Sequence, residues 1–217
     1  MRSDSEIRDD VEAELRYDPD MANADIAVSA KDGVVTLAGF ARSYLQKWEA
    51  ERAAKRVKGV RAVANDIEVR LPSMDSRPDP EIAREAVHAL TTTLPYSGEK
   101  FTVTVENGMA TLDGEAEWQY QRQQAEAAVR RIRGVRGVIN LIELKAKAPV
   151  ATVRKMIEDA LKRSAEIDAQ NIAVEADGDK VILKGKVRSW TERQEAERAA
   201  WRAPGVRKVE DHITIGV

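Results

Sequence analysis

The chain has 217 residues, with 35 lysines and arginines against 37 aspartates and glutamates, and a formal net charge of −2. This balance gives no general attraction to nucleic acid, so we expect no nucleic-acid partner. No cysteine is present, which excludes disulfides and thiolate metal sites. No apolar run approaches the roughly 20 residues that span a bilayer. No signal-peptide pattern opens the chain, so we expect a cytoplasmic location, or a periplasmic one if a leader was removed.

The sequence repeats itself three times. The segment Gly33–Gly39 recurs at Gly108–Gly114 and again around Gly178–Gly185. Apolar positions keep the two offsets, 75 and 146 residues, through the whole first third, which chance does not explain. We therefore predict three homologous modules, at residues 5–70, 79–146 and 149–217.

Each module opens with a predicted helix and two predicted strands. In module one, Ile7, Val11 and Leu15 recur every four residues, which marks one face of a helix. Apolar and polar residues then alternate through residues 26–37, as in half-buried strands. Asp32-Gly33 interrupts this alternation and favours a tight hairpin turn.

A second helix and a third strand complete the module. The helix presents the small residues Ala50, Ala53 and Val57 on one face and stops at Gly59, a residue typical of helix ends. Residues 63–69 alternate again. The order α-β-β-α-β predicts an α+β fold, a two-layer sandwich in which two helices pack on one face of a three-stranded sheet.

The two linkers differ in length. Residues 70–78 contain two prolines, so we expect module one to move relative to the others, whereas residues 145–148 are short and keep modules two and three close. Modules of about 65 residues are marginally stable alone. We therefore expect the modules to be stabilised by packing against one another or against a second copy of the chain.

One set of apolar residues and glycines carries a family resemblance. In module one it comprises Val28, Gly33, Val35, Leu37, Gly39, Ala50, Ala53, Val57, Gly59, Val60, Val63, Asn65 and Ile67. This pattern resembles the BON domain, named for bacterial osmotically inducible and nodulation proteins, and all three modules share it. The resemblance implies the α-β-β-α-β fold. It also implies a non-enzymatic role, described in the family as binding phospholipid membranes or supporting the envelope under osmotic stress.

No catalytic set emerges from the sequence. His88 and His212 do not recur between modules and lack metal-ligand spacing, so we interpret them as ordinary surface histidines. The glycines serve turns and helix ends and form no phosphate-binding loop. We expect no catalytic residue, no metal site, no cofactor and no enzymatic activity.

Aromatic residues on the second helices are the candidate binding residues. Helical geometry turns Tyr44 and Trp48 away from the small-residue face of module one, and Trp190 and Trp201 away from that of module three. Exposed aromatics of this kind mark interfaces, and tryptophan beside basic residues also suits a membrane surface. The alternative is that the rings pack on neighbouring modules or on their own loops.

Module two has apolar residues where an open sheet face is expected to be polar. Ile139 and Leu141 take the places of Ala64 and Asp66 of module one, and Met109 lies nearby in the predicted sheet. We expect this face to dock another module or a second chain.

Three functions remain open. The first is a stress-related binding or scaffold protein that acts by multivalent protein contact. The second is a peripheral protein that binds phospholipid membranes. The third is a sensor of a cation or a small ligand, using carboxylates in loops such as residues 18–25, which lack a calcium-loop pattern.

Overall fold

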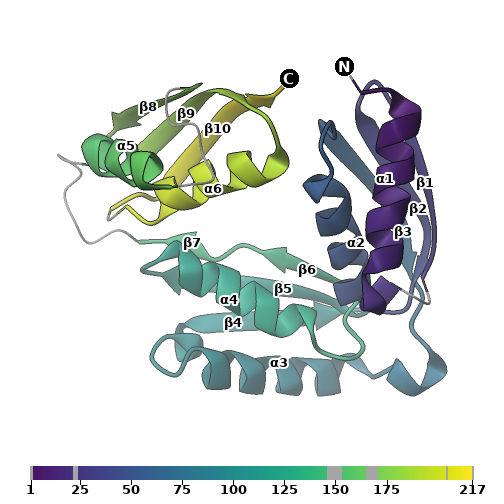
Figure 1. Cartoon of the computed structure of the whole chain (residues 1–217). Coiled ribbons are helices and arrows are strands. Elements are labelled where there is room, and N and C mark those ends of the chain that lie inside the picture. Colours follow the sequence, from purple (N-terminus) through teal and green to yellow (C-terminus); the bar gives the residue numbers. More distant parts are fainter. Residues whose placement is uncertain (1, 22–23, 146–152, 165–170, 204, 217) are drawn as a thin grey trace.

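The structure is a computed structural model that describes residues 2–21, 24–145, 153–164, 171–203 and 205–216. It is an α+β fold of three modules, each with its own sheet and its own buried core, as predicted (Figure 1). The described loops also contain short 3-10 turns: η1 (Pro19–Met21), η2 (Ser73–Asp75) and η3 (Gly98–Lys100).

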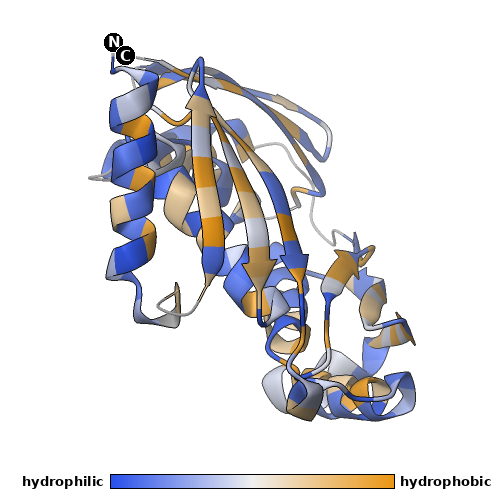
Figure 2. Ribbon diagram, turned by 90° about the vertical axis from the view of Figure 1, so that its right-hand side faces the viewer, coloured by the Kyte–Doolittle hydropathy of each residue, from blue (hydrophilic) through white to orange (hydrophobic). Residues whose placement is uncertain are grey.

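Module one shows the shared topology. Its elements are helix α1 (Asp4–Tyr17), strands β1 (Asp25–Lys31) and β2 (Val34–Ala41), helix α2 (Tyr44–Arg56) and strand β3 (Ala62–Val69). Strand β2 pairs antiparallel with β1 and parallel with β3. Parallel strands need a crossover, which α2 supplies. Figure 2 shows hydrophobic and hydrophilic residues alternating along these strands, as expected for a sheet with one covered face.

Helix α1 is fixed at its start by two sets of hydrogen bonds. Ser3 and Glu6 form the capping box that their spacing indicates, with Ser3 N–H donating to the Glu6 carboxylate at 2.7 Å. The Asp4 carboxylate accepts the backbone N–H groups of Asp32 and Gly33, at 2.8 and 3.0 Å. The first helix thus holds the hairpin turn, and Asp79 does the same in module two.

Module two repeats this plan with one interruption. Its elements are α3 (Asp79–Thr93), β4 (Phe101–Glu106), β5 (Met109–Ala116), α4 (Gln119–Arg130), β6 (Gly137–Asn140) and β7 (Glu143–Leu144). The predicted third strand is therefore split, and both β6 and β7 pair parallel with β5. Between them the Leu141 N–H still donates to the Leu112 carbonyl at 2.8 Å, so the strand keeps its course along β5.

Module three contains α5 (Val153–Arg163), β8 (Ile172–Asp177), β9 (Lys180–Val187), α6 (Trp190–Trp201) and β10 (Lys208–Ile215). Its sheet has the order β10-β9-β8, equivalent to that of module one. Val153, Ile157 and Leu161 of α5 are buried, as are the equivalent residues of α1 and α3. The four-residue spacing thus identified the buried face of each first helix.

Close contact between strands explains the second glycine that the three repeats share. Gly39 has φ of +128°, and a Cβ atom there would lie 2.0 Å from the carbonyl oxygen of Asp25 on β1. Gly114 and Gly185 have the same left-handed backbone and the same close approach. Only a residue without Cβ fits both conditions, so the paired strands require glycine here.

No helix in the described part of the chain is both long and apolar enough to span a bilayer.

Candidate functional site

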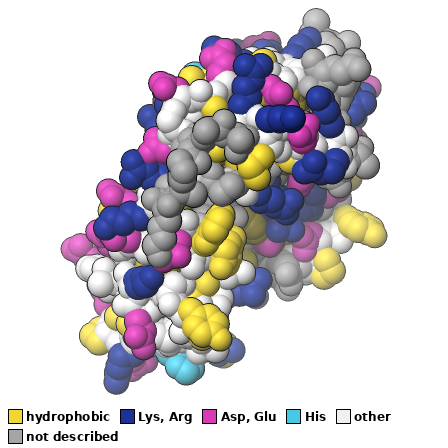
Figure 3. All heavy atoms as spheres, turned by 90° about the vertical axis from the view of Figure 1, so that its left-hand side faces the viewer, with side chains coloured by type: hydrophobic (Ala, Val, Ile, Leu, Met, Phe, Trp, Pro, Cys, Tyr) yellow, Lys and Arg dark blue, Asp and Glu magenta, His cyan; other side chains and the backbone are white. Residues whose placement is uncertain are grey.

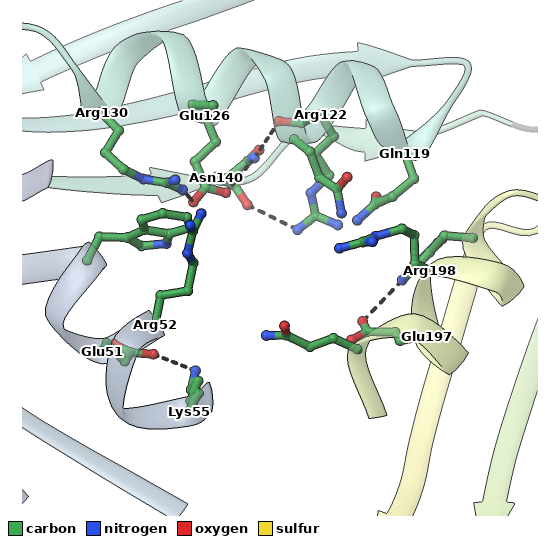
Figure 4. Close-up of a pocket in the computed structure, with 15 residues that line it drawn as sticks. Glu51, Arg52, Lys55, Gln119, Arg122, Glu126, Arg130, Asn140, Glu197 and Arg198 are labelled. Carbon is green, nitrogen blue, oxygen red and sulfur yellow. Dashed lines mark hydrogen bonds and ion pairs between the residues drawn. The ribbon is translucent and has the colours of Figure 1, made fainter. Parts of the chain in front are cut away.

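The second helices of the modules, α2, α4 and α6, surround a cavity of about 640 Å³ (Figure 4). Most of its lining consists of equivalent residues from each module, in four sets: Trp48, Gln123 and Gln194; Glu51, Glu126 and Glu197; Arg52, Ala127 and Arg198; Lys55, Arg130 and Trp201. The same face of the second helix therefore lines the cavity in all three modules.

The start of α2 joins module one to module two. Tyr44 packs against the core of module two; this burial raises the pKa of its hydroxyl, and a hydrogen bond with the Val138 backbone opposes the rise. The guanidinium carbon of Arg130 lies 3.8 Å from the centre of the Trp48 ring. Because the Arg130 side chain is only 8% exposed, this cation–π contact is largely screened from water and is stronger than a surface contact.

The start of α6 joins module three to module one in the same way. Trp190, equivalent to Tyr44, packs against the core of module one. The ammonium nitrogen of Lys55 lies 5.1 Å from the centre of its ring, and the guanidinium carbon of Arg193 lies 5.0 Å from it. The buried indole nitrogen of Trp190 has no hydrogen-bond partner among the described residues. This junction therefore relies on ring burial and cation–π contact.

The third side of the cavity lies between α4 and α6. Trp201 packs beside the core of module three, and its indole N–H donates to the Glu197 carboxylate at 3.2 Å. It lines the cavity together with Gln119 and Gln123 of α4. Trp201 thus occupies the position that Lys55 and Arg130 take in the other modules.

The four predicted aromatic residues are half-buried. Tyr44, Trp48 and Trp190 do turn away from their own cores, and each contacts a neighbouring module. For these three residues the structure matches the alternative given above, in which the rings pack on neighbouring modules. That the four aromatic residues, Trp201 included, bind a partner or a membrane stays a prediction. Module one, which we expect from its linker to move relative to the others, contacts both other modules in this structure.

The carboxylates of the cavity wall are held by neighbours in their own modules. Glu51 accepts hydrogen bonds from Lys55 at 2.5 Å and from the Asn65 amide at 3.0 Å. Burial raises the pKa of Glu51, but these two donors more than offset it, so its pKa lies below the usual value. Glu126 forms the equivalent bonds with Arg130 and with the Asn140 amide. Glu51 is therefore an ionised wall residue and does not have the raised pKa of a general acid.

The predicted apolar face of module two is exposed in the structure. Met109, Ile139 and Leu141 are 38%, 46% and 54% exposed. Ile139 pairs with Thr111 across β5 and β6, and Met109 pairs with Gly137. The side chains share the outer face of the sheet, opposite the helices, because they alternate with inward-facing residues. That another module or a second chain docks on this face stays a prediction.

A second apolar cluster, which was not predicted from the sequence, lies where α4 begins. Tyr96 is 96% exposed, and Trp118 and Tyr120 are 43% and 54% exposed. The loop of Tyr96 reaches the start of α4, because the Gln121 amide donates to the Ser97 hydroxyl at 3.2 Å. Figure 3 shows hydrophobic side chains on this side of the molecule, with basic ones nearby. The sequence feature that could have indicated this cluster is Trp118, which stands where α2 and α6 have a capping serine.

Both histidines are exposed, as interpreted from the sequence. His88 lies on α3, and His212 lies on β10, where its Nε2 atom is 3.9 Å from Glu210. Among the described residues, no three or more histidine, aspartate or glutamate side chains are grouped as metal ligands.

The repeated topology, the paired glycines and the sequence pattern point to one family. The family model of the BON domain matches residues 3–70, 79–146 and 149–217. The chain belongs to the BON domain family. It is a tandem array of three BON domains.

Solved structures with weak similarity also align with the BON array. Two are structures of CdsD, a structural protein of the type III secretion system of Chlamydia trachomatis. One is 15% identical with a TM-score of 0.27, and the alignment covers 97% of this chain and 92% of that one. The other, its C-terminal domain, is 14% identical with a TM-score of 0.27 and full coverage of both chains. The PrgH periplasmic domain is 12% identical with a TM-score of 0.22, covering 96% and 99%. No curated protein matches the sequence.

Proposed function

We propose that this BON array is a non-enzymatic binding or scaffold protein, linked to osmotic or envelope stress, that acts by multivalent protein contact. The observation that carries the proposal is the exposed apolar face of module two, formed by Met109, Ile139 and Leu141. Exposed apolar residues gathered on one face are typical of a protein–protein interface. Three modules packed about one cavity give this face a fixed position relative to the rest of the array.

The apolar face is specific to module two. Module one has Ala64 and Asp66 at the positions of Ile139 and Leu141, and module three has Glu210 and His212 there. A purely structural requirement of the fold would apply to all three sheets. We therefore assign the difference to contact with a partner, either a second copy or another protein.

Substitution of Ile139 and Leu141 by serine tests the proposal. The double variant should fold, because both side chains are exposed, and should lower the self-association or partner retention of the full chain. A matched control changes Ala64 and Asp66 to serine and should behave as the wild type. The measurement is sedimentation velocity over a concentration series, together with partner retention on an immobilised chain. Unchanged association and retention in the module two variant would refute the proposal.

Binding to phospholipid membranes is the second candidate. The cluster of Tyr96, Trp118 and Tyr120 favours it, because exposed aromatic rings insert at the membrane–water boundary. Co-sedimentation with phosphatidylglycerol vesicles should then fall when Trp118 and Tyr120 become alanine. Trp48 should matter less, because it already stacks on Arg130. Vesicle binding that is absent in the wild type, or unaffected by the cluster variant, would exclude this route.

A further inference from the structure

The cavity between α2, α4 and α6 has a cationic excess in its lining. Its ionisable residues are Arg52, Lys55, Arg122, Arg130 and Arg198, against Glu51, Glu126 and Glu197. The cavity exists only where the three modules meet, so no single BON domain contains it. Its volume, about 640 Å³, lies in the range of sites for small molecules.

The carboxylates in this wall are already engaged. Glu51 and Glu126 each accept a cation and an asparagine amide, and Glu197 accepts the Trp201 indole N–H. Lys55 and Arg130 thus balance the charges of Glu51 and Glu126, whereas Glu197, which accepts from a neutral donor, keeps its negative charge. Of the remaining cations, Arg52 pairs with Glu49 and Arg198 with Glu195, so Arg122 is the cation in the described lining without a carboxylate partner.

Two arginines from different modules face each other in this cavity. Figure 4 shows the side chains of Arg122, on α4, and Arg198, on α6, extending toward one another beside the Gln119 amide. Arg122 donates to the Asn140 carbonyl at 3.3 Å, and no described carboxylate lies within salt-bridge distance of it. Arg198 pairs with Glu195 through Nη1 alone. Each guanidinium thus keeps N–H donors for a further acceptor.

We propose that the cavity binds a small free anion whose carboxylate or phosphate oxygens bridge Arg122 and Arg198. Guanidinium groups match these oxygens through paired N–H donors, which a fixed point charge does not provide. An anion between the two groups removes the repulsion between them and links module two to module three. The proposal goes beyond the protein-binding function, since it concerns the interior of the array and not the outer face of module two.

Titration of the full chain with inorganic phosphate and with citrate tests the proposal. Isothermal calorimetry at low ionic strength should show saturable binding of one anion per chain, which sodium chloride at matched ionic strength does not reproduce. The thermal midpoint should rise with anion concentration. Arg122→Gln and Arg198→Gln should each weaken binding at least tenfold. Arg84→Gln removes the same charge from the exposed side of α3 and should leave binding unchanged.

Three results overturn the proposal. These are the absence of saturable heat with both anions, equal weakening in the Arg84→Gln control, and unchanged binding in both cavity variants. If vesicles of phosphatidylglycerol require Arg122 and Arg198 while the free anions do not bind, the acceptor is a lipid headgroup and a free anion is excluded. Arg198 is half-exposed, so Arg198→Gln folds and gives an answer even if the other variant does not.

Discussion

Replacing Trp190 by alanine should uncouple module three from module one. The ring of Trp190 covers part of the module one core, and the ammonium nitrogen of Lys55 lies 5.1 Å from the ring centre in a cation–π contact. It belongs to module three but contributes little to that module's own core, so its loss acts mainly on the junction. The expected result is that the two modules unfold more independently.

The size of the effect follows from the contacts. Truncating a fully buried tryptophan costs about 3–5 kcal/mol, and Trp190 is half-buried, which gives about 2 kcal/mol. Loss of the Lys55 contact adds about 0.5–1 kcal/mol. The indole N–H of Trp190 is buried without a hydrogen-bond partner, so removing it stabilises the junction by about 1 kcal/mol. The net loss of coupling is about 2 kcal/mol.

Calorimetry and hydrogen exchange measure this loss. Trp190→Ala should broaden or split the thermal unfolding transition and speed amide exchange in α2, which contacts α6. Trp190→Phe is the matched control, because it keeps a ring and removes the unpaired N–H; it should stay within about 1 kcal/mol of the wild type. An alanine variant with the same transition and the same exchange in α2 would show that the junction contributes no coupling.

Three further predictions concern the modules themselves. Gly185→Ala should cost more than 3 kcal/mol in chemical denaturation, since its Cβ would meet the Asn171 carbonyl at 2.0 Å, whereas Gly178→Ala, with open space around it, should cost about 1 kcal/mol. Two lysines lower the pKa of Glu210 from 4.5 to about 2, so its contribution to stability is complete above pH 4.5 and is lost as the pH falls toward 2. Thermal midpoints of the wild type and Glu210→Gln should therefore converge in that window, and a constant difference would contradict the assignment. Ser43→Ala should cost about 1 kcal/mol in urea unfolding by removing the α2 cap, and an unchanged midpoint would mean that the cap is dispensable.

The fold of each module could be predicted from the sequence because local signals agree with one another. Spacing in the first helices, the hairpin turns and the glycines at helix ends each specify a nearby backbone shape, and the triple repeat supplies independent copies of every signal. The interruption between β6 and β7 was missed, because residues 138–142 are apolar apart from Asn140 and contain no glycine or proline that would indicate a break in the strand.

The site could be predicted only in part. Helical geometry correctly turned Tyr44, Trp48 and Trp190 away from their own cores, but it contains no information about what lies opposite. The partner surfaces belong to other modules, at sequence separations that no local pattern records. The facing arginines of the cavity, Arg122 and Arg198, are not even equivalent positions in the repeat, so the offsets did not bring them together.

The cavity that all three modules line has a consequence for how the array can diverge. In a ring of identical subunits every substitution appears three times, so a wall cannot be changed on one side alone. Here the three walls are encoded separately, and the position of Lys55 already holds an arginine in module two and a tryptophan in module three. Because the three modules are joined in one chain, equivalent helix faces can carry different side chains. The cavity they line is therefore chemically asymmetric, which suits an asymmetric ligand.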